Sequence, residues 1–463
     1  MNGIVNGPAN GLGQAIGTDG GRSHPLVAYR QVDLSSLKSY MLTLMMRNIT
    51  SNGFVFEDPQ KPGTYSSPGS VLAAPSYPAN TPGVDQDYVF NWVRDSAITM
   101  IEIAEARLPA INGGVEALCD YVTFASLCFA NATPSKGHAC FTVEGDSRCW
   151  TEQNDGPALQ SITLLRAFDQ LDQPSQQAAI ALINANVAYL LDDDEYQKPT
   201  VNLWEEHQGL SFFAYSAQLK CFRAIAANTI GAAVPGGIEP AIAWLETEIA
   251  AHWNGSYYVS LATPGSNPLQ SVVPGYDANI DIIQASIYGA VPCTDPKLLA
   301  TAAILHQQWS DPASPTVYPI NIADQARGIG PLFGRYPSDI YDGDVSHPVD
   351  GGHPWALSTA NFAELLYTLA TTIGASKKVS LDPLSTPFFA GFGIGATTKP
   401  ADAVAALRSA GDAMLRAVLF HSDRYELSEQ FDAQSGYEKS VRNLTWSYAA
   451  FLSALRARDA QAA

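Results

Sequence analysis

The stretch QQAAIALINANVAYLL, residues 176–191, shows the pattern on which the fold of this chain depends. Its apolar residues Ile180, Ile183, Val187 and Leu190 recur at steps of three and four, so they share one face of an α-helix. A helix with one apolar face must bury that face against another element. The number and order of such helices therefore determine the fold class.

The same periodicity returns along the whole chain. Other clear helical stretches are 95–108, the segment opened by Asp155-Gly156-Pro157, 212–226, 355–369, 404–419 and 445–456. Weaker candidates are 34–47, 114–129, 237–252, 279–287 and 296–309. The best strand candidate is 256–260, which we expect to be one arm of a hairpin. About a dozen helices, without the repeat of about 20–50 residues typical of a solenoid, predict an all-α toroid of helical hairpins.

Composition excludes several classes of protein. The chain has 463 residues, of which 46% are hydrophobic and only 15% are charged, so it can bury a large core and is not a disordered chain. Its 26 basic and 45 acidic residues give a formal charge of −19. Nucleic acids and anionic membranes prefer the opposite sign, so we expect neither as a partner. No apolar run reaches the roughly 18 residues of a membrane span.

The chain divides into two unequal parts. Residues 1–30 are rich in Gly and Asn, and we expect an irregular segment without a visible signal peptide. Residues 31–463 contain no Ser/Thr/Pro-rich linker, so we expect one domain there. Of the six cysteines, the first four match neither zinc-binding nor redox spacings.

Acidic residues in two separate loops suggest acid–base catalysis. Glu205 and Glu206 follow Trp204 at what we expect to be the start of a helix. They could simply offset the helix dipole, or one of them could be a carboxyl group kept protonated against an aromatic wall, ready to act as a general acid. Glu429 lies in a distant loop and could be an ordinary exposed acid. Two acids from separate loops are, however, what hydrolysis of a glycosidic bond requires.

Two further loops combine aromatic and charged residues. Tyr88 and Trp92 precede Arg94-Asp95, which could cap a helix and pair with a surface acid, or could fix the hydroxyl groups of a sugar that stacks on the rings. Arg335 lies in a second aromatic loop that ends at His353-Pro354-Trp355. The spacing of His347 and His353 does not resemble that of a metal-binding pair.

With these residues identified, the chain resembles the glucoamylases, glycoside hydrolase family 15. The segments that carry the resemblance occur in the family's order and are YVFNWVRDSA (88–97), NDGPAL (154–159), NLWEEHQGLSFF (202–213), GRYPSDIY (334–341), HPW (353–355), LSEQFD (427–432) and NLTWSYAA (443–450). They span nearly the whole chain. The resemblance implies an (α/α)₆ barrel, which agrees with the independent count of helices, and a catalytic domain at 31–463 without a starch-binding module.

The resemblance also implies roles for individual residues. Glu205 would be the general acid and Glu429 the general base of an inverting exo-hydrolase that releases β-D-glucose from the non-reducing ends of α-1,4-linked glucans and maltooligosaccharides. The two carboxyl groups would then stand about 6.5–9.5 Å apart. The implied substrate-binding residues are Tyr88, Trp92, Arg94, Asp95, Leu203, Trp204, Glu206, Arg335, Trp355 and Trp446. No metal or other cofactor is implied, and we expect a monomer.

The sequence departs from the family pattern before NDGPAL, where Trp150 stands one residue closer than usual to that segment. This departure leaves two alternatives open in the same scaffold, an exo-glucosidase that prefers α-1,6 linkages (isomaltose or dextran) and one that prefers trehalose. A non-catalytic sugar-binding protein is the alternative from another class. The implied substrate favours a secreted enzyme, although no signal peptide is visible.

Overall fold

The fold is described by a computed structural model for residues 33–51, 56–57, 62–75, 88–108, 113–343 and 352–460. The irregular segment expected at 1–30 lies outside these residues. The α-helices are α3 (Lys38–Met46), α4 (Val93–Ala106), α5 (Gly114–Asn131), α6 (Gly156–Ala167), α7 (Gln173–Leu191), α8 (Phe212–Ala226), α9 (Ile238–Ala251), α10 (Asp281–Ile287), α11 (Pro296–Ser310), α12 (Pro319–Arg327), α13 (Ala356–Ser376), α14 (Thr386–Gly391), α15 (Pro400–His421) and α16 (Thr445–Asp459). The strands are β1 (Asn91–Trp92), β2 (Cys140–Phe141), β3 (Thr200–Val201), β4 (Gln208–Ser211), β5 (Leu261–Ala262), β6 (Gln430–Phe431) and β7 (Glu438–Lys439).

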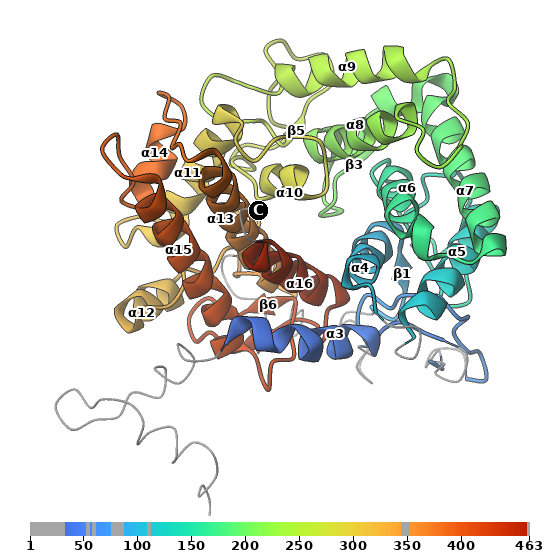
Figure 1. The fold of residues 1–463 in the computed structure, drawn as a ribbon, viewed down its shortest axis with the longest axis horizontal. Helices are drawn as coiled ribbons and strands as arrows, with labels where there is room; N and C mark the ends of the chain where they lie inside the picture. The colour runs from blue at the N-terminus through green and yellow to red at the C-terminus, as the bar shows by residue number, and fades with distance from the viewer. Residues whose placement is uncertain are drawn as a thin grey trace, which may run out of the picture.

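Six helices form a closed inner ring (Figure 1). Going round it, α4 packs on α6, α6 on α8, α8 on α10, α10 on α13, α13 on α16, and α16 on α4 again. Most residues of α4, α8 and α13 are buried, as expected of helices covered on all sides.

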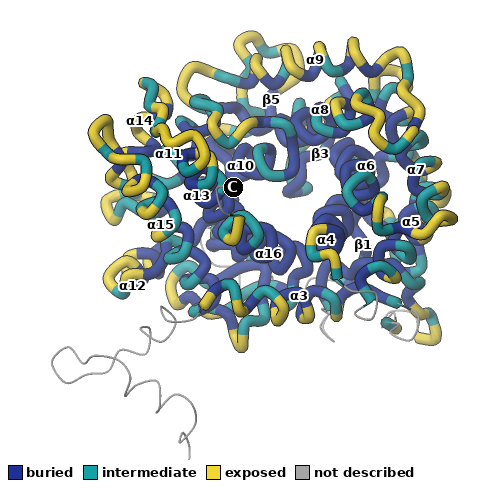
Figure 2. The backbone as a smooth tube through the Cα atoms, in the orientation of Figure 1, coloured by how far each residue is buried: buried dark blue, intermediate teal, exposed yellow. Residues whose placement is uncertain are grey.

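A second set of helices surrounds this ring. Each outer helix packs on the inner helix that follows or precedes it in the chain: α5 on α4, α7 on α6, α9 on α8, α11 on α10 and α15 on α13, while α3 packs on α16. The outer helices bury one face and expose the other (Figure 2). In α7, for example, Ile183, Val187 and Leu190 of the predicted apolar face are buried. The architecture is therefore the expected (α/α)₆ barrel, and among the described residues no helix is long and apolar enough to cross a membrane.

Short local signals set the ends of the helices. Asp172 accepts a hydrogen bond from the backbone N–H of Ser175 at the start of α7, and Asp295 does the same for Lys297 and Leu298 at the start of α11. A proline follows in the first turn of each helix, where its missing N–H costs nothing.

Three features differ from the sequence-based expectations. Helices α12 and α14 were not predicted, because they are short and bury few residues. The prediction of a strand at 256–260 is wrong. In this segment only Tyr258 makes an isolated bridge, to Trp253, and strand β5 begins after the segment. The helix expected to start at Glu205 begins at Phe212 instead.

Because outer and inner helices alternate along the chain as hairpins, all six inner helices start at the same end of the barrel. The segments that lead into them carry β1, the β3–β4 pair and the β6–β7 pair. All the aromatic and charged loops singled out in the sequence lead into inner helices.

Candidate active site

A cavity of about 400 Å³ opens at the end of the barrel where the inner helices start. It is lined by all twelve site residues predicted from the sequence: Tyr88, Trp92, Arg94, Asp95, Leu203, Trp204, Glu205, Glu206, Arg335, Trp355, Glu429 and Trp446. The remaining lining residues are Ala73, Arg148, Trp150, Tyr341 and Leu444. Segments more than three hundred residues apart in the chain therefore meet around one space.

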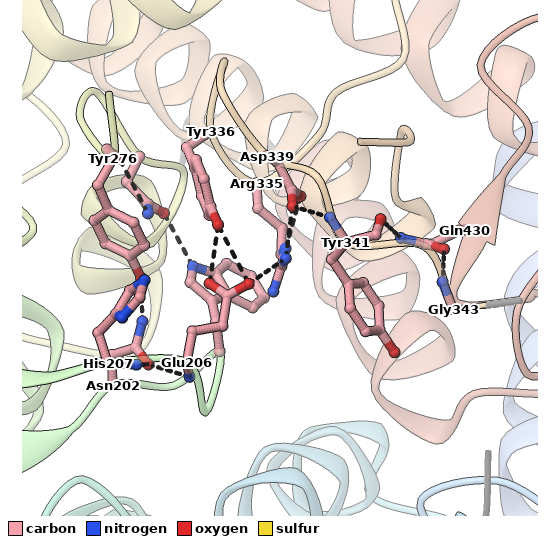
Figure 3. A network of polar contacts seen from close by, with 12 residues as sticks. Asn202, Glu206, His207, Tyr276, Arg335, Tyr336, Asp339, Tyr341, Gly343 and Gln430 are labelled. Carbon is pink, nitrogen blue, oxygen red and sulfur yellow. Dashed lines mark hydrogen bonds and ion pairs between the residues drawn. The ribbon is translucent and has the colours of Figure 1, made fainter. Parts of the chain in front are cut away.

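Glu205 and Glu206 lie in the turn between β3 and β4, not at a helix start. Ser211 caps the following helix in their place, by accepting a hydrogen bond from the N–H of Ala214. Asn202 organises the turn. Its Oδ1 accepts a hydrogen bond from the N–H of Glu206 at 3.0 Å (Figure 3). Its backbone oxygen accepts a hydrogen bond from the N–H of Glu205. Glu205 takes a left-handed φ of 63°, which is uncommon for a residue with a side chain and is found often at functional sites.

The carboxyl group of Glu205 is held through one of its two oxygens. Trp92 Nε1 donates to Oε1 at 2.9 Å, and Gln153 Nε2 donates to the same atom at 3.1 Å. No described residue hydrogen-bonds Oε2. Since Glu205 lines the cavity, Oε2 is the oxygen available to a ligand.

Glu429 is held differently, by three hydroxyl groups. Tyr88 donates to Oε1 at 2.9 Å, Tyr341 donates to Oε2 at 3.4 Å, and Ser440 also donates to Oε2. Burial raises the pKa of Glu429, and the hydroxyl donors together with the charge of Arg335 oppose that rise. Only 3% of the residue is exposed. A carboxylate with three donors is restrained and still keeps lone pairs for a ligand.

Arg94 and Asp95 form a buried charged pair in the wall of the cavity. Arg94 Nη1 donates to Gln153 Oε1 at 2.6 Å and to Asp155 Oδ2 at 3.1 Å, and its Nε lies 3.7 Å from Asp95 Oδ2. Asp155 lies directly before α6, but its side chain makes no capping hydrogen bond. Burial raises the pKa of Asp95 to about 7, against the opposing effect of Arg94. At neutral pH, Asp95 can therefore either donate or accept a hydrogen bond.

Another part of the cavity wall is built around Arg335 (Figure 3). Asp339 accepts two hydrogen bonds from its guanidinium, of 2.8 and 2.7 Å, and Glu206 Oε1 accepts a third of 2.6 Å. Tyr336 also donates to Glu206 Oε2 at 3.0 Å. With its exposed fraction at 2%, Arg335 is a fixed cation whose charge is balanced by two carboxylates.

Tryptophan rings close the sides of the cavity. Trp204 stacks on Trp446 with ring centroids 6.1 Å apart, and Trp355 lies 5.7 Å from Trp204. Trp204 Nε1 is fixed by Asn279 Oδ1 at 3.0 Å. Leu203 is buried beside them. The tryptophan faces can pack against the apolar faces of a ligand ring, while the polar groups between them can hydrogen-bond the polar edge of that ring.

Sequence reasoning missed several residues of the site. Gln153 and Ser440 contact the two glutamates, and Tyr341 and Arg148 line the cavity. Tyr341 closes the GRYPSDIY segment, so that motif could have indicated it. For Ser440 and Arg148 no local pattern gave a signal.

The histidine of the HPW segment is held by the backbone of a neighbouring loop. His353 Nδ1 accepts a hydrogen bond from the backbone N–H of Ala433 at 3.1 Å, and His347 lies outside the described residues. Among the described residues, no group of three or more His, Cys, Asp or Glu side chains is arranged to hold a metal ion.

Comparisons with known proteins agree with this geometry. The family model described as glycosyl hydrolases family 15 matches residues 41–456. A probable glucoamylase of Schizosaccharomyces pombe is 25% identical over 443 residues, covering 90% of this chain and 89% of the relative. A glucoamylase of Saccharomycopsis fibuligera is 25% identical and covers 92% of this chain and 90% of the relative.

Solved structures share the fold. A glucoamylase structure from Saccharomycopsis fibuligera superposes with a TM-score of 0.73 at 21% identity, covering 92% of this chain and 96% of that one. The glucoamylase structure from Hormoconis resinae gives a TM-score of 0.73 at 25% identity, covering 93% and 74%.

Fold and cavity together define a glycoside hydrolase, because the chain forms an (α/α)₆ barrel whose cavity is lined by carboxyl groups and aromatic rings. The chain belongs to glycosyl hydrolases family 15.

Proposed function

We propose that this enzyme is an inverting exo-hydrolase that releases β-D-glucose from the non-reducing ends of α-1,4-linked glucans and maltooligosaccharides. The observation that carries the proposal is the unlike environment of two glutamates on one cavity. Glu205 has one oxygen held by N–H donors and one left for a ligand, whereas Glu429 is surrounded by hydroxyl donors. Inversion requires one carboxyl group as an acid and a second as a base.

Glu205 is assigned the role of general acid. Its Oε2 has no described hydrogen-bond partner and can carry the proton to the glycosidic oxygen. Trp92 and Gln153 fix the carboxyl group through Oε1, which sets the direction in which Oε2 points. A fixed donor transfers its proton as the bond to the leaving group breaks.

Glu429 is assigned the role of general base. Tyr88, Tyr341 and Ser440 donate hydrogen bonds to its carboxyl group and so favour its ionised form. The ionised group takes a proton from a water molecule, and that water attacks the anomeric carbon from the face opposite the leaving oxygen. The configuration at that carbon is thereby inverted.

The non-reducing glucose is assigned to the inner end of the cavity. Arg94 and Asp95 are almost fully buried in the first turn of α4, so a sugar that contacts them cannot extend further inward. Their charge-assisted hydrogen bonds would hold its outer hydroxyl groups. Arg335 and Glu206 would hold the hydroxyl groups nearer the cleaved bond, with Trp204, Trp355 and Trp446 against the ring faces. A site that accepts only a chain end makes the enzyme exo-acting.

The names of the relatives support the choice of substrate. The proteins from Schizosaccharomyces pombe and Saccharomycopsis fibuligera cited above are called a probable glucoamylase and a glucoamylase, and each aligns over most of its length. The acidic chain also agrees with a neutral sugar rather than an anionic ligand.

The test is a digestion of maltopentaose labelled at its reducing end. We expect unlabelled glucose from the first samples, with the label retained on maltotetraose and then on shorter oligosaccharides. Labelled maltose or maltotriose as first products would contradict exo-action. Faster hydrolysis of isomaltose or trehalose than of maltose, at equal concentrations, would contradict the α-1,4 preference and favour one of the two alternatives in the same scaffold.

A further inference from the structure

The segment that follows Tyr341 lies directly against the assigned base, Glu429. The N–H of Gly343 donates to Gln430 Oε1 at 2.9 Å, and Gln430 Nε2 donates to the backbone oxygen of Tyr341 at 3.2 Å (Figure 3). A side chain at position 343 would overlap Ser440, and its Cβ would lie 3.0 Å from Oε2 of Glu429. This segment therefore carries one of the hydroxyl donors to Glu429, Tyr341, and packs on another, Ser440.

Asp342, in the middle of this segment, is anchored on two sides. Its Oδ1 lies 3.0 Å from Nζ of Lys439, which belongs to β7, and its Oδ2 lies 3.4 Å from Nε2 of His353. The side chains of Asp342, Lys439 and His353 are 5%, 8% and 2% exposed. Breaking a buried pair leaves a charge that water does not reach, so these contacts restrain the segment more firmly than exposed ones would.

The backbone fixes which nitrogen of His353 faces Asp342. His353 Nδ1 accepts a hydrogen bond from the N–H of Ala433 at 3.1 Å, so the neutral ring carries its proton on Nε2, towards Asp342. Burial lowers the pKa of His353, and the charge of Lys439 acts in the same direction, while the charges of Asp342 and Asp432 oppose it. The cluster is therefore an ion pair supported by a neutral histidine.

Each member of the ion pair is the neighbour in sequence of one hydroxyl donor to the base. Asp342 follows Tyr341, and Lys439 precedes Ser440. Both hydroxyl groups donate to Oε2 of Glu429. Neither Asp342 nor Lys439 lines the cavity, so an effect of the pair on the reaction passes through the residues beside it.

We propose that the ion pair between Asp342 and Lys439 positions the general base, by holding Tyr341 and Ser440 where their hydroxyl groups restrain Glu429 and favour its ionised form. Asp342 and Lys439 are positioning residues, since neither reaches the substrate. The inference rests on the proposed function, because it takes Glu429 as the base.

Positioning and charge alone predict different results. Loss of the negative charge of Asp342 would by itself lower the pKa of Glu429, and loss of the positive charge of Lys439 would raise it. Loss of the hydroxyl donors raises this pKa whichever partner is removed, because these donors, Tyr88 and the charge of Arg335 oppose the effect of burial. We expect the loss of donors to prevail, because the hydroxyl groups contact the carboxylate directly.

The experiment measures kcat/KM for maltotriose against pH in the wild type, Asp342→Ala and Lys439→Met. The acidic limb of this profile reports the pKa of the base in the free enzyme. We expect the limb to move to higher pH in both variants, by about one pH unit, as for the loss of a hydrogen bond to a charged group. The matched controls are Arg223→Met and Glu246→Ala, which break an exposed ion pair between α8 and α9 and should leave the limb in place.

A limb that stays in place, or that moves to lower pH in Asp342→Ala, would overturn the inference. If Asp342→Ala does not fold, Lys439→Met is compared with and without Tyr341→Phe and Ser440→Ala. The inference predicts no further shift from Lys439→Met once both donors are gone. A shift of the same size in that background would mean that Lys439 acts by charge alone, and would contradict the inference. Full turnover in Glu429→Gln would instead refute the proposed function.

Discussion

The indole N–H of Trp92 donates a 2.9 Å hydrogen bond to Oε1 of Glu205, although the two residues lie 113 positions apart in the chain. Trp92 is the last residue before α4, and Glu205 lies in the turn that leads to α8. The bond therefore joins two of the loops at the open end of the barrel. It also selects Oε1 as the restrained oxygen and leaves Oε2 for the substrate, which is the basis of the role assigned to Glu205.

Replacing either assigned glutamate should abolish most of the activity without unfolding the protein. We expect Glu205→Gln and Glu429→Gln each to lower kcat by about 10²- to 10⁴-fold, the usual contribution of a general acid or base. The measurement is the initial rate of glucose release from maltotriose, with circular dichroism as the check on folding. Glu246→Gln, at an exposed position of α9, is the control and should keep full activity. Turnover close to that of the wild type in either active-site variant would show that its assignment is wrong.

Ser440 should control the acidic limit of the pH profile. Burial raises the pKa of Glu429, and the hydrogen bond from Ser440 lowers it again. Ser440→Ala removes this donor, so the pKa of Glu429 rises further and a larger fraction of the base is protonated at low pH. The acidic limb of kcat/KM should therefore move to higher pH, with the plateau little changed.

Tyr88→Phe removes another donor to the same carboxyl group and should move the limb in the same direction. Ser435→Ala is the control, because Ser435 contacts Asp432 on the same hairpin and not Glu429. An acidic limb that stays in place in both Ser440→Ala and Tyr88→Phe would contradict the assignment of Glu429 as the base.

The pair of Arg94 and Asp155 should stabilise the fold as well as the site. Both side chains are 4% exposed, so Asp155→Ala leaves Arg94 buried with a weaker set of partners. We expect the free energy of unfolding to fall by about 3–5 kcal/mol, as for other buried ion pairs that lose one member. The control is Asp169→Ala, which breaks an exposed pair with Arg107 at 2.9 Å and should cost about 1 kcal/mol at most. Equal losses in the two variants, measured by denaturant unfolding, would contradict the account.

Stability should decrease as the pH rises from about 4 to about 7. Burial raises the pKa of Asp281 to about 7 and that of Asp277 to about 6, so the folded protein binds more protons than the unfolded chain in this range. Proton binding by the folded state is lost as the pH rises through these values, and the free energy of unfolding falls with it.

Asp281→Asn removes the carboxyl group with the larger rise in pKa. The thermal midpoint of the variant should exceed that of the wild type at pH 7, and the difference should shrink towards pH 4. A difference that is the same at both pH values would show that Asp281 is ionised in the folded protein throughout this range.

Sequence periodicity predicted the helices that bury a continuous apolar face. The apolar stripe at 212–226 predicted the body of helix α8, eleven of whose residues are buried, although its start was expected earlier. Helix α12 buries only three residues, so the pattern there was too weak to detect. Glu205 was expected at a helix start because acids are common there, but Ser211 supplies the cap of α8 and the acid is free to lie in a turn.

The site was predictable where its residues lie in short motifs, and not where they act through distant contacts. Arg94, Glu205 and Glu429 stand out in their segments. Ser440 reaches Glu429 only because the β6–β7 pair folds the chain back on itself. Asp155 sits at a helix start, yet its carboxylate binds Arg94 rather than the helix, which no local pattern reveals.

The central claim is that water attacks from the face opposite the leaving oxygen, with Glu205 as acid and Glu429 as base. Proton NMR of a maltopentaose digest, followed from the first minute, tests it most directly, because the two anomers of glucose have separate signals and interconvert slowly. The account predicts that the glucose formed first is the β-anomer and that the α-anomer appears later by mutarotation. Glucose that appears first as the α-anomer would contradict it.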